Sequence, residues 1–557
     1  MISIGTTGRV GIFLCECGEE IAPVVDLTKL SAKIGGADMP VSVHVTRYWC
    51  SGAGRRLLAS TIEKEGLDAV VVAGCSERML GPLMRDTAER AGVNRNRTVL
   101  ANLREHCANV HVGKRAAATA KALRLVRAGV EKALRAEKLE PIVSDVSRSV
   151  AVIGGGISGL TVARSLAARD IPVTLIERDA ELGGTLRSIN RLFPSYCNSA
   201  EYAGQVAAEA SGDPNVEVWT SSRVTGVAGH AGDFRLTVES EGSTRELSVG
   251  CVVLATGADV LVPYGLFEYD DNTKVVTQLE FEAMLREGLG TVKRIVMIQC
   301  VGSRNEERPY CSRVCCTATV KNTITVLEQV PNAEITVLTR GFAQYVGDLD
   351  RARSAGVTFL RYDPERPPEV GVETVEVFDV ISSEEVAIRY DLVVLATPLV
   401  AYDETVELAG LLGVPSDRHG FIAEPHTKLR PGKFAPRGVF VVGSAHWPAT
   451  VTECQSQAYS AAARAAELLS SDVIEREPVV AVVDELTCRG CGECAEACAH
   501  DAVVMRDSDD GMKTASVDTV RCVGCGVCTQ VCPSSAVTLR HLTPGQLLAM
   551  VSATVGA

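Results

Sequence analysis

The feature that most constrains this chain is a cysteine pattern that occurs twice near its C-terminus. Each copy has the form C-x-x-C-x-x-C-x-x-x-C, and equivalent cysteines lie 34 positions apart. The similarity continues into a short predicted strand after each copy, at 502–506 and 536–540. The eight cysteines of this duplication are Cys488, Cys491, Cys494, Cys498, Cys522, Cys525, Cys528 and Cys532. A run with this spacing wraps three thiolates around one iron–sulfur cube, and its fourth cysteine crosses to the other cube.

The crossing predicts two ligand sets within a C-terminal α+β ferredoxin domain over residues 481–557. The first set is Cys488, Cys491, Cys494 and Cys532, and the second is Cys522, Cys525, Cys528 and Cys498. Pro533 follows the second run, whereas Ala499 stands at the matching place after the first, which alters no ligand. Zinc knuckles or purely structural thiols are the alternatives. The duplicated four-cysteine runs favour two [4Fe–4S] clusters.

A second cysteine group lies in the segment QCVGSRNEERPYCSRVCC and consists of Cys300, Cys311, Cys315 and Cys316. Residues 294–298 predict a buried parallel strand, so Cys300 emerges at its carboxyl end, where α/β sheets bind ligands. Cys311 and Cys315 are spaced one helical turn apart, and the N-terminus of the next predicted helix would stabilise thiolates there. The spacing matches no common ferredoxin. We predict a further iron–sulfur cluster, with a redox dithiol or buried thiols as the alternatives.

Five more cysteines are scattered over the N-terminal region: Cys15, Cys17, Cys50, Cys75 and Cys107. Strands predicted at 11–14 and 70–74 deliver three of them at their carboxyl ends, so one rim of an α/β domain can gather a fourth cluster. Five candidates exceed the four places of one cluster, and separate buried cysteines are the alternative. We predict an N-terminal iron–sulfur α/β domain over 1–148, which closes with an amphipathic helix over 114–140 and a linker.

A dinucleotide fingerprint lies between these cysteine groups. A predicted strand runs into a helix through a G-x-G-x-x-G turn formed by Gly154, Gly156 and Gly159. The first glycine permits the tight turn, the second admits a pyrophosphate to the helix N-terminus, and the third lets helix and strand pack closely. A second strand at 173–176 ends before Glu177, at the spacing where a carboxylate binds a ribose hydroxyl. The sequence therefore predicts a bound dinucleotide.

Later glycines favour FAD over NAD as that dinucleotide, because they fit the pattern of flavoproteins with two dinucleotide-binding domains. The further candidates for contacts with FAD are Gly183, Gly184, Thr256, Gly257 and Gly443. The fold class is therefore α/β. We predict an FAD-binding Rossmann half over 149–282, a nested second Rossmann-like domain over 283–395, and completion of the FAD domain over 396–480.

The second Rossmann-like domain lacks a glycine fingerprint of its own. After the predicted strand at 295–298, the expected glycine-rich turn is replaced by Gln-Cys-Val-Gly-Ser at 299–303. A nicotinamide pyrophosphate would meet cysteines there in place of bare backbone amides. We therefore predict that this chain does not take hydride directly from NAD(P)H, and that its electrons arrive through the clusters or from a partner.

Composition excludes several other classes of protein. The 557 residues include 56 basic and 69 acidic side chains, a formal charge of −13 that disfavours binding to nucleic acid. No apolar run reaches the roughly 18 residues of a membrane span, and the first ten residues lack a secretory signal, so we expect a cytoplasmic protein. Twenty cysteines in such a chain favour metal ligation. Three of them, Cys197, Cys251 and Cys454, stand alone and are expected to be small core residues.

Together these motifs resemble the A subunit of heterodisulfide reductase, the FAD subunit of electron-bifurcating complexes in methanogens and of related bacterial complexes. The likeness covers nearly the whole chain and includes FLCECG at 13–18, Cys50-Ser51, GCS at 74–76, NLREHCANVH at 102–111 and, most distinctively, QCVGSRNEERPYCSRVCC. It implies a thioredoxin-reductase-like flavin core, an unusual four-iron cluster on the Cys300 group, and another cluster on the N-terminal cysteines. In that family the flavin splits an incoming electron pair between a high-potential disulfide-reducing branch and low-potential ferredoxin.

Three departures from the family bear on whether this chain bifurcates electrons. Methanogen members carry an extra ferredoxin module inside the flavin domain, whereas residues 198–250 contain no cysteine here. Ser444 replaces the cysteine of the final flavin strand, and Ala449 and Thr450 replace a lysine and an aspartate. Cys197 stands where the family tends to have two cysteines. We expect one electron branch to be missing and the flavin to be tuned differently.

The sequence therefore predicts an oxidoreductase subunit that interconverts electron pairs and single electrons, without a nameable general acid, base or nucleophile. The resemblance implies a hetero-oligomer, which includes the case of a dimer of such assemblies. Its expected partners are proteins like the B and C subunits of heterodisulfide reductase, ferredoxin, and a hydrogenase, formate dehydrogenase or NADH-oxidising module. One rival function is a self-contained NAD(P)H-dependent flavin reductase fused to ferredoxin, which the missing second fingerprint disfavours. The other is a non-catalytic wiring or assembly subunit, which the intact first fingerprint disfavours.

Overall fold

The computed structural model describes residues 8–35, 41–342, 346–424, 432, 434, 437–507 and 511–555. The chain forms two units, Met1–Val143 with Glu475–Ala557, and Ser144–Ile474. It passes between them at β5 (Ile142–Asp145) and β24 (Val473–Arg476). The first seven residues, where we expect no secretory signal, lie outside the described part. No described helix is long and apolar enough to cross a membrane.

The N-terminal part of the first unit is a three-layer α/β fold around a parallel sheet of order β2-β1-β3-β4. Its strands are β1 (Val10–Cys15), β2 (Val41–Thr46), β3 (Ala69–Gly74) and β4 (Thr98–Asn102). Its helical segments are α1 (Leu27–Gly35), α2 (Gly52–Glu65), α3 (Glu77–Arg90), η1 (Arg95–Arg97), η2 (Arg104–Ala108) and α4 (Arg115–Arg135). Side chains alternate between the two faces. Ile12 and Leu14 therefore pack against α1 and α4, whereas Phe13 packs against α2 and α3.

Helix α4 is shorter than the predicted helix over 114–140. It ends at Arg135, and the backbone N–H of Ala136 donates to the carbonyl of Ala133. The remaining predicted residues precede Pro141, whose ring disfavours helical backbone in the residue before it. The composition of this segment therefore predicted a longer helix than the chain forms.

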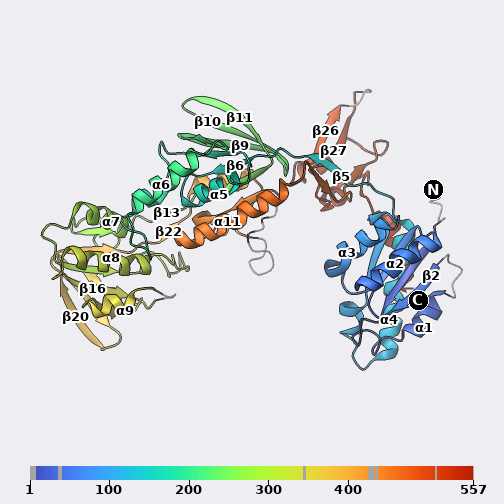
Figure 1. Cartoon of the computed structure of the whole chain (residues 1–557), viewed down its shortest axis with the longest axis horizontal. Coiled ribbons are helices and arrows are strands. Elements are labelled where there is room, and N and C mark those ends of the chain that lie inside the picture. The colour runs from blue at the N-terminus through green and yellow to red at the C-terminus, as the bar shows by residue number, and fades with distance from the viewer. Residues whose placement is uncertain are drawn as a thin grey trace. The chain divides into compact units, whose positions relative to one another are not determined.

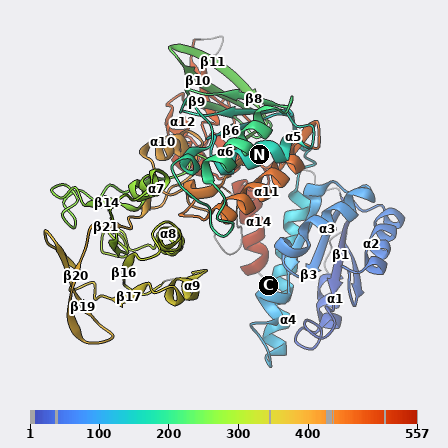
Figure 2. The same ribbon diagram turned by 60° about the vertical axis from the view of Figure 1, so that its left-hand side comes forward.

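The C-terminal part of the first unit is a small α+β fold in which β25 pairs with β28 and β26 with β27, both antiparallel. Its elements are β25 (Ala481–Val483), α12 (Glu493–Glu496), β26 (Val503–Asp507), β27 (Lys513–Val517), α13 (Val527–Val531), β28 (Val537–Leu539) and α14 (Pro544–Val555). Helix α14 lies along α4 (Figure 2), and Gln546 Nε2 donates to the carbonyl of Arg135 at 2.8 Å. The apolar tail is thus a helix packed on the chain's own N-terminal part.

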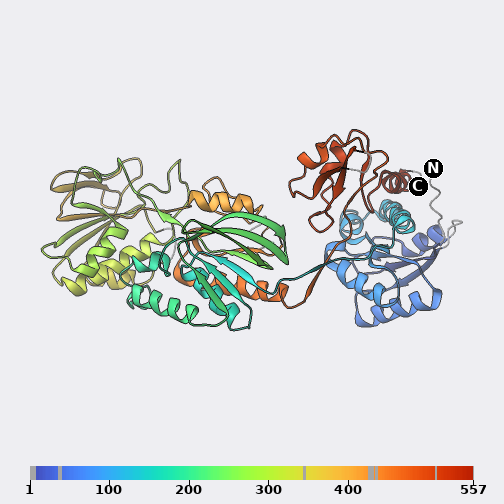
Figure 3. The same cartoon turned by 90° about the horizontal axis from the view of Figure 1, so that it is seen from above.

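The second unit contains a parallel sheet of order β23-β12-β6-β7-β8. Its strands are β6 (Val150–Ile153), β7 (Val173–Ile176), β8 (Val216–Trp219), β12 (Cys251–Leu254) and β23 (Val439–Val441). One face is covered by helices, and the helical segments here are α5 (Ile157–Ala167), η3 (Gly184–Arg187), α6 (Ser199–Ser211), η4 (Gly443–Ala445) and α11 (Val451–Leu468). The other face is covered by an antiparallel sheet and a helix, β9 (Ser222–His230), β10 (Asp233–Ser240), β11 (Ser243–Val249) and α10 (Asp403–Leu411). Figure 3 shows this green three-stranded sheet with α10 beside it.

A second parallel sheet, of order β14-β21-β15-β16-β17, repeats this plan (Figure 1). Its strands are β14 (Val275–Thr277), β15 (Arg294–Ile298), β16 (Glu334–Thr339), β17 (Thr358–Arg361) and β21 (Leu392–Leu395). Helices cover one face, α7 (Gln278–Glu287), α8 (Cys315–Gln329) and α9 (Leu349–Ser354). An antiparallel sheet covers the other, β18 (Glu369–Val370), β19 (Thr374–Asp379) and β20 (Glu384–Arg389). The two halves are joined by the antiparallel pair β13 (Asp259–Val260) and β22 (Leu399–Val400).

Candidate functional site

The fingerprint turn joins β6 to α5, and its first and third glycine positions leave no room for a side chain. Gly154 has φ +111°, and a Cβ there would lie 2.3 Å from the carbonyl oxygen of Ala255. A Cβ on Gly159 would lie 1.9 Å from the carbonyl oxygen of Gly154. Gly156 is the N-cap of α5, so the first amides of that helix are left without side-chain cover. The turn therefore presents bare backbone donors at a helix N-terminus, which suits a pyrophosphate.

A cavity of about 510 Å³ borders this turn. Seven of the predicted FAD-contacting residues line it: Gly154, Gly156, Glu177, Gly183, Gly184, Thr256 and Gly257. Gly159 and Gly443 do not line the cavity. Gly443 packs behind it, where a Cβ would lie 2.2 Å from Ser158 Oγ. The cavity has the residues that a flavin dinucleotide requires, a glycine cradle at one end and an apolar wall that includes Leu192 and Phe193.

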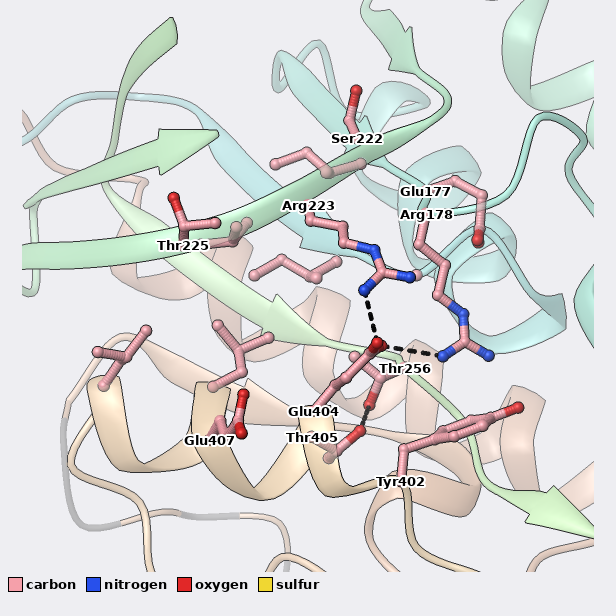
Figure 4. A pocket seen from close by; sticks show the side chains of 16 residues that line it. Glu177, Arg178, Ser222, Arg223, Thr225, Thr256, Tyr402, Glu404, Thr405 and Glu407 are labelled. Carbon is pink, nitrogen blue, oxygen red and sulfur yellow. Dashed lines mark hydrogen bonds and ion pairs between the residues drawn. The ribbon is translucent and has the colours of Figure 1, made fainter. Parts of the chain in front are cut away.

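A second cavity, of about 320 Å³, adjoins the first and shares Gly154, Glu177, Arg178, Thr256 and Tyr402 with it (Figure 4). One carboxylate oxygen of Glu177 accepts a hydrogen bond from the N–H of Gly155, and the other accepts from the N–H of Asp179 at 2.9 Å. This carboxylate is therefore fixed at the junction of the two cavities. The pair of cavities forms one elongated site, as an extended dinucleotide needs.

Sequence reasoning missed a buried ion pair in the wall of the first cavity. The Nζ of Lys321 pairs with Glu282, and the two side chains are 3% and 4% exposed. Nζ also donates to the carbonyl of Arg191 at 2.9 Å, and the N–H of Asn190 donates to Glu282. Burial lowers the pKa of Lys321, and the carboxylate of Glu282 opposes that change. A lone basic residue inside the otherwise uncharged run CCTATVKNTITV was the available signal.

Two residues at the start of α11 also have positions that the sequence did not predict. Cys454, expected to be a core residue, is buried but lines the first cavity, and burial raises its pKa. Thr450, which stands where the resembled family has aspartate, is the N-cap of α11 and forms a capping box with Glu453. Cys251 is buried in β12, and Cys197 is exposed. Only Cys454 among the three isolated cysteines therefore faces the flavin cavity.

The structure brings Cys300, Cys311, Cys315 and Cys316 together at the carboxyl end of β15 and the start of α8. Burial, together with the neighbouring thiolates of Cys300 and Cys311, raises the pKa of Cys315 to about 12. Burial also raises the pKa of Cys300, which Arg304 opposes with its Nη1 at 3.7 Å from the sulfur. Two of the four thiols, Cys315 and Cys316, are buried, and thiols that repel one another when ionised need cations among them to persist as thiolates. An iron–sulfur cluster supplies such cations, so this residue set fits one.

The loop that carries Cys311 is tied to the flavin half. Ser312 is fully buried, and its Oγ accepts a hydrogen bond from the N–H of Leu399 at 2.9 Å. Arg313 pairs with Glu453 on α11 and donates to the carbonyl of Pro448 at 3.3 Å. The next residues along α8, Val314, Thr317 and Ala318, line the 510 Å³ cavity. The cysteine group and the predicted flavin site therefore share one helix turn.

At the N-terminal domain, four of the five predicted cysteines gather beyond β1 and β3. The sulfurs of Cys17 and Cys75 lie 3.7 Å apart. Burial raises the pKa of Cys15, and Cys75 and Cys50 raise it further, so these four are neighbours. Cys107 is elsewhere, fully buried in the core against α4, where its thiol donates to the carbonyl of Ala118 at 3.1 Å. The group thus has four members, and Arg104 Nη1 lies 3.6 Å from the sulfur of Cys75.

The C-terminal domain brings its eight cysteines together in the two crossed sets. One small cavity is lined by Cys488, Cys491, Cys494 and Cys532, and the other by Cys498, Cys522, Cys525 and Cys528. Burial, together with its three cysteine neighbours in the cavity, raises the pKa of Cys528 to about 11. Among the residues that the structure describes, no three His, Cys, Asp or Glu side chains lie close enough to hold a single metal ion. Each set instead surrounds a space of its own.

Two family models match parts of this chain. Residues 148–458 match the pyridine nucleotide-disulphide oxidoreductase family, and residues 487–536 match the 4Fe-4S dicluster domain. These matches confirm the predicted α/β flavoprotein fold, its FAD and the [4Fe–4S] clusters of the C-terminal domain.

Relatives that align over most of the chain give the same result. The chain is 30% identical to the second iron-sulfur A subunit of CoB–CoM heterodisulfide reductase from Methanopyrus kandleri, over 90% of this chain and 92% of the relative. It is 29% identical to the A subunit of H2:CoB-CoM heterodisulfide,ferredoxin reductase from Methanothermobacter marburgensis, over 91% and 92%. The first alignment spans 607 positions against 557 residues here, so the relative has segments without a counterpart in this chain. Thioredoxin reductase from Lactococcus lactis, 18% identical, aligns with 58% of this chain and 99% of its own at a TM-score of 0.42.

Proposed function

Because this chain belongs to the family of heterodisulfide reductase A subunits, we propose that its α8 cysteine group is the place where electrons enter and leave the flavin cavity. The chain is an FAD- and iron–sulfur-dependent electron-transfer subunit of an oxidoreductase complex. When bound, FAD exchanges electron pairs with single electrons, and the clusters carry single electrons. The protein contributes by positioning and tuning these groups.

One observation carries the proposal. Val314, Thr317 and Ala318 line the flavin cavity, and Cys315 and Cys316 lie between them on the same turn of α8. A ligand set and a cofactor wall on one helix turn cannot move apart. The pairing of Arg313 with Glu453 ties this turn to α11 of the flavin half and keeps the separation fixed.

Charged side chains around this turn set the electrostatic environment of the two cofactors. Arg304 and Arg340 each lower the pKa of Cys300 and so favour its thiolate. Lys321 and Glu282 place a buried ion pair in the cavity wall, where low dielectric strengthens its field. We propose that the ammonium of Lys321 places positive charge in this wall and would raise the affinity of a bound flavin for added electrons.

We assign the remaining cysteines to three further sets. The two C-terminal clusters take the crossed sets, with Cys498 and Cys532 exchanged between the runs. The N-terminal cluster takes Cys15, Cys17, Cys50 and Cys75, whereas Cys107 is a core residue. The grouping of four thiols around one rim supports this choice over any set that includes Cys107.

The resemblance supports proteins like the B and C subunits of heterodisulfide reductase as partners. The name of the Methanothermobacter relative supports a hydrogen-oxidising donor and ferredoxin for that protein. For this chain we propose a separate electron-delivering protein, such as a hydrogenase, formate dehydrogenase or NADH-oxidising module. The reason is that Cys300 occupies the turn after β15 where NAD(P)H would require glycine amides.

Anaerobic purification followed by iron, sulfide and flavin analysis tests the assignment. Four cubanes predict about 16 irons and one FAD per chain. About eight irons would mean that only the C-terminal pair assembles, and would overturn the role given to α8. Material with a full complement of iron but no FAD would instead support the alternative of a non-catalytic wiring protein.

A further inference from the structure

The 320 Å³ cavity borders Glu177 and Arg178 and extends between β9 and α10, so it is the place for the group attached to the ribose (Figure 4). Apolar side chains such as Ile176, Val224 and Leu408 supply part of its wall. An apolar slot next to a ribose-binding carboxylate suits the flat adenine base of a dinucleotide. This reasoning rests on the FAD site proposed above.

Three charged side chains from three different parts of the chain are joined by ion pairs at the rim of this cavity. Glu404 on α10 pairs with Arg178, which follows β7, through Oε2 and Nη1 at 3.1 Å. It also pairs with Arg223 on β9 through Oε1 and Nη1 at 2.6 Å. The guanidinium of Arg178 also lies 4.2 Å from the ring centroid of Tyr402, which lines the same cavity. Figure 4 shows both arginines converging on the one carboxylate.

We propose that Glu404 is a latch that holds α10 over the adenine end of the FAD site and slows release of the cofactor. Because its two partners come from β9 and from the segment after β7, one carboxylate ties both segments to the helix. Thr405, next to it, donates from Oγ1 to Thr256 Oγ1 at 2.8 Å and anchors the same helix to the turn after β12. Glu404 positions the wall of the site and does not touch the reacting ring.

The two ion pairs of Glu404 are strong enough to change the rate of FAD release but too weak to determine whether the protein folds. The three side chains are 33%, 49% and 61% exposed, so water and salt screen the pairs. Exposed pairs of this kind change an equilibrium by up to about fivefold each. Two pairs on one carboxylate therefore predict a several-fold effect that weakens at high ionic strength.

The test measures the rate at which the purified, FAD-loaded full chain releases FAD, followed by the rise of free flavin fluorescence on dilution. Glu404→Gln should speed release about five- to tenfold at low salt, and roughly 1 M salt should remove most of that difference. Asp403→Asn is the matched control, because it removes the same charge from the same first turn of α10 without touching either arginine. It should stay within about twofold of the wild type and so isolate the ion pairs from the helix dipole.

Arg223→Gln provides a second route to the same conclusion, and the iron content of each variant reports whether it has folded. Both changes break the same ion pair. The double variant Glu404→Gln/Arg223→Gln should therefore release FAD at most about twofold faster than Glu404→Gln alone. Equal release by Glu404→Gln and Asp403→Asn would overturn the latch and leave the proposed function standing. A wild-type chain that holds no FAD would instead refute the proposed function.

Discussion

The two parallel sheets of the second unit have the same plan but offer a ligand different chemistry. In each, the chain leaves a central strand, β6 or β15, through a turn with positive φ: Gly154 at +111° and Cys300 at +60°. In the first sheet the turn offers backbone amides. In the second sheet the turn offers a thiol side chain, and a non-glycine residue bears the backbone strain of about 1–2 kcal/mol. The edge of the sheet thus fixes where a ligand binds, and the residue in the turn fixes what it is.

The helices that follow these turns differ in the same way. Helix α5 begins at Ile157, directly after the glycines, and exposes its first amides to a phosphate. Helix α8 begins at Cys315, after a loop that carries Cys311 and is pinned by Ser312. The second domain therefore places thiols where the first offers uncapped helix amides, so the sequence that lacks an NAD(P)H turn carries a cysteine group in its place.

The largest expected effect comes from filling the first turn. Gly154→Val adds a β-branched side chain at φ +111° and 2.3 Å from the carbonyl of Ala255. We expect FAD affinity to fall at least about 100-fold, because strain and overpacking together cost a few kcal/mol. Flavin titration of the variant, with iron counted in parallel, measures it. Gly204→Ala in α6, where a Cβ meets nothing within 4 Å, should bind FAD normally; retention of FAD by Gly154→Val would refute the fingerprint.

The complementary change is in the second turn. Cys300→Gly relieves the positive φ but removes a thiol from the group of four, so we expect about four of roughly 16 irons to be lost while FAD remains bound. Iron and sulfide analysis of anaerobic protein shows this directly. Cys197→Ala removes an exposed thiol outside every group and should leave the iron count unchanged. A full iron count in Cys300→Gly would break the contrast between the two turns.

The buried ion pair gives a smaller effect, on stability. Lys321→Met leaves the Glu282 carboxylate without its partner at 4% exposure and should destabilise the second unit by about 3 kcal/mol. Lys321→Met combined with Glu282→Gln should recover most of this loss, since no charge is then left unpaired and Gln still accepts from the N–H of Asn190. The urea midpoint for FAD release measures both. If the double variant is as unstable as the single one, packing rather than charge explains the pair.

The smallest effect, no change in iron content, is expected from Cys107→Ala beside the N-terminal sheet, which extends the comparison. Its strand ends also deliver thiols, but one of the five cysteines points into the core. Cys107→Ala should keep the iron count of the wild type, whereas Cys50→Ala should lower it by about four. Loss of iron in Cys107→Ala with none in Cys50→Ala would reverse the assignment.

The spacing of residues within short motifs predicted the local features of the structure. The 34-residue repeat predicted both crossed ligand sets, and the glycine fingerprint predicted the cavity, because each is a short motif whose geometry follows from residue type. The strand ends also predicted that N-terminal cysteines gather at one rim. Which four gather depends on the η2 turn, which sends Cys107 into the core against α4, and no spacing rule contains that turn.

Contacts between distant segments could not be predicted in this way. Glu282 and Lys321 lie on α7 and α8, and Glu404 meets Arg178 and Arg223 only after three elements have been brought together. The amphipathic pattern likewise did not show that α14 would cover α4. Each of these depends on packing between elements, for which one sequence alone carries little information.

The central claim is that electrons reach the flavin through the cysteine group of α8 and not from a pyridine nucleotide. Anaerobic stopped-flow mixing tests it, with flavin absorbance followed after the addition of NADH or of reduced ferredoxin. The account predicts fast flavin reduction by ferredoxin, at least tenfold slower reduction in Cys300→Gly, and no reduction by NADH alone over the same time. Rapid bleaching by NADH, unchanged in Cys300→Gly, would contradict it.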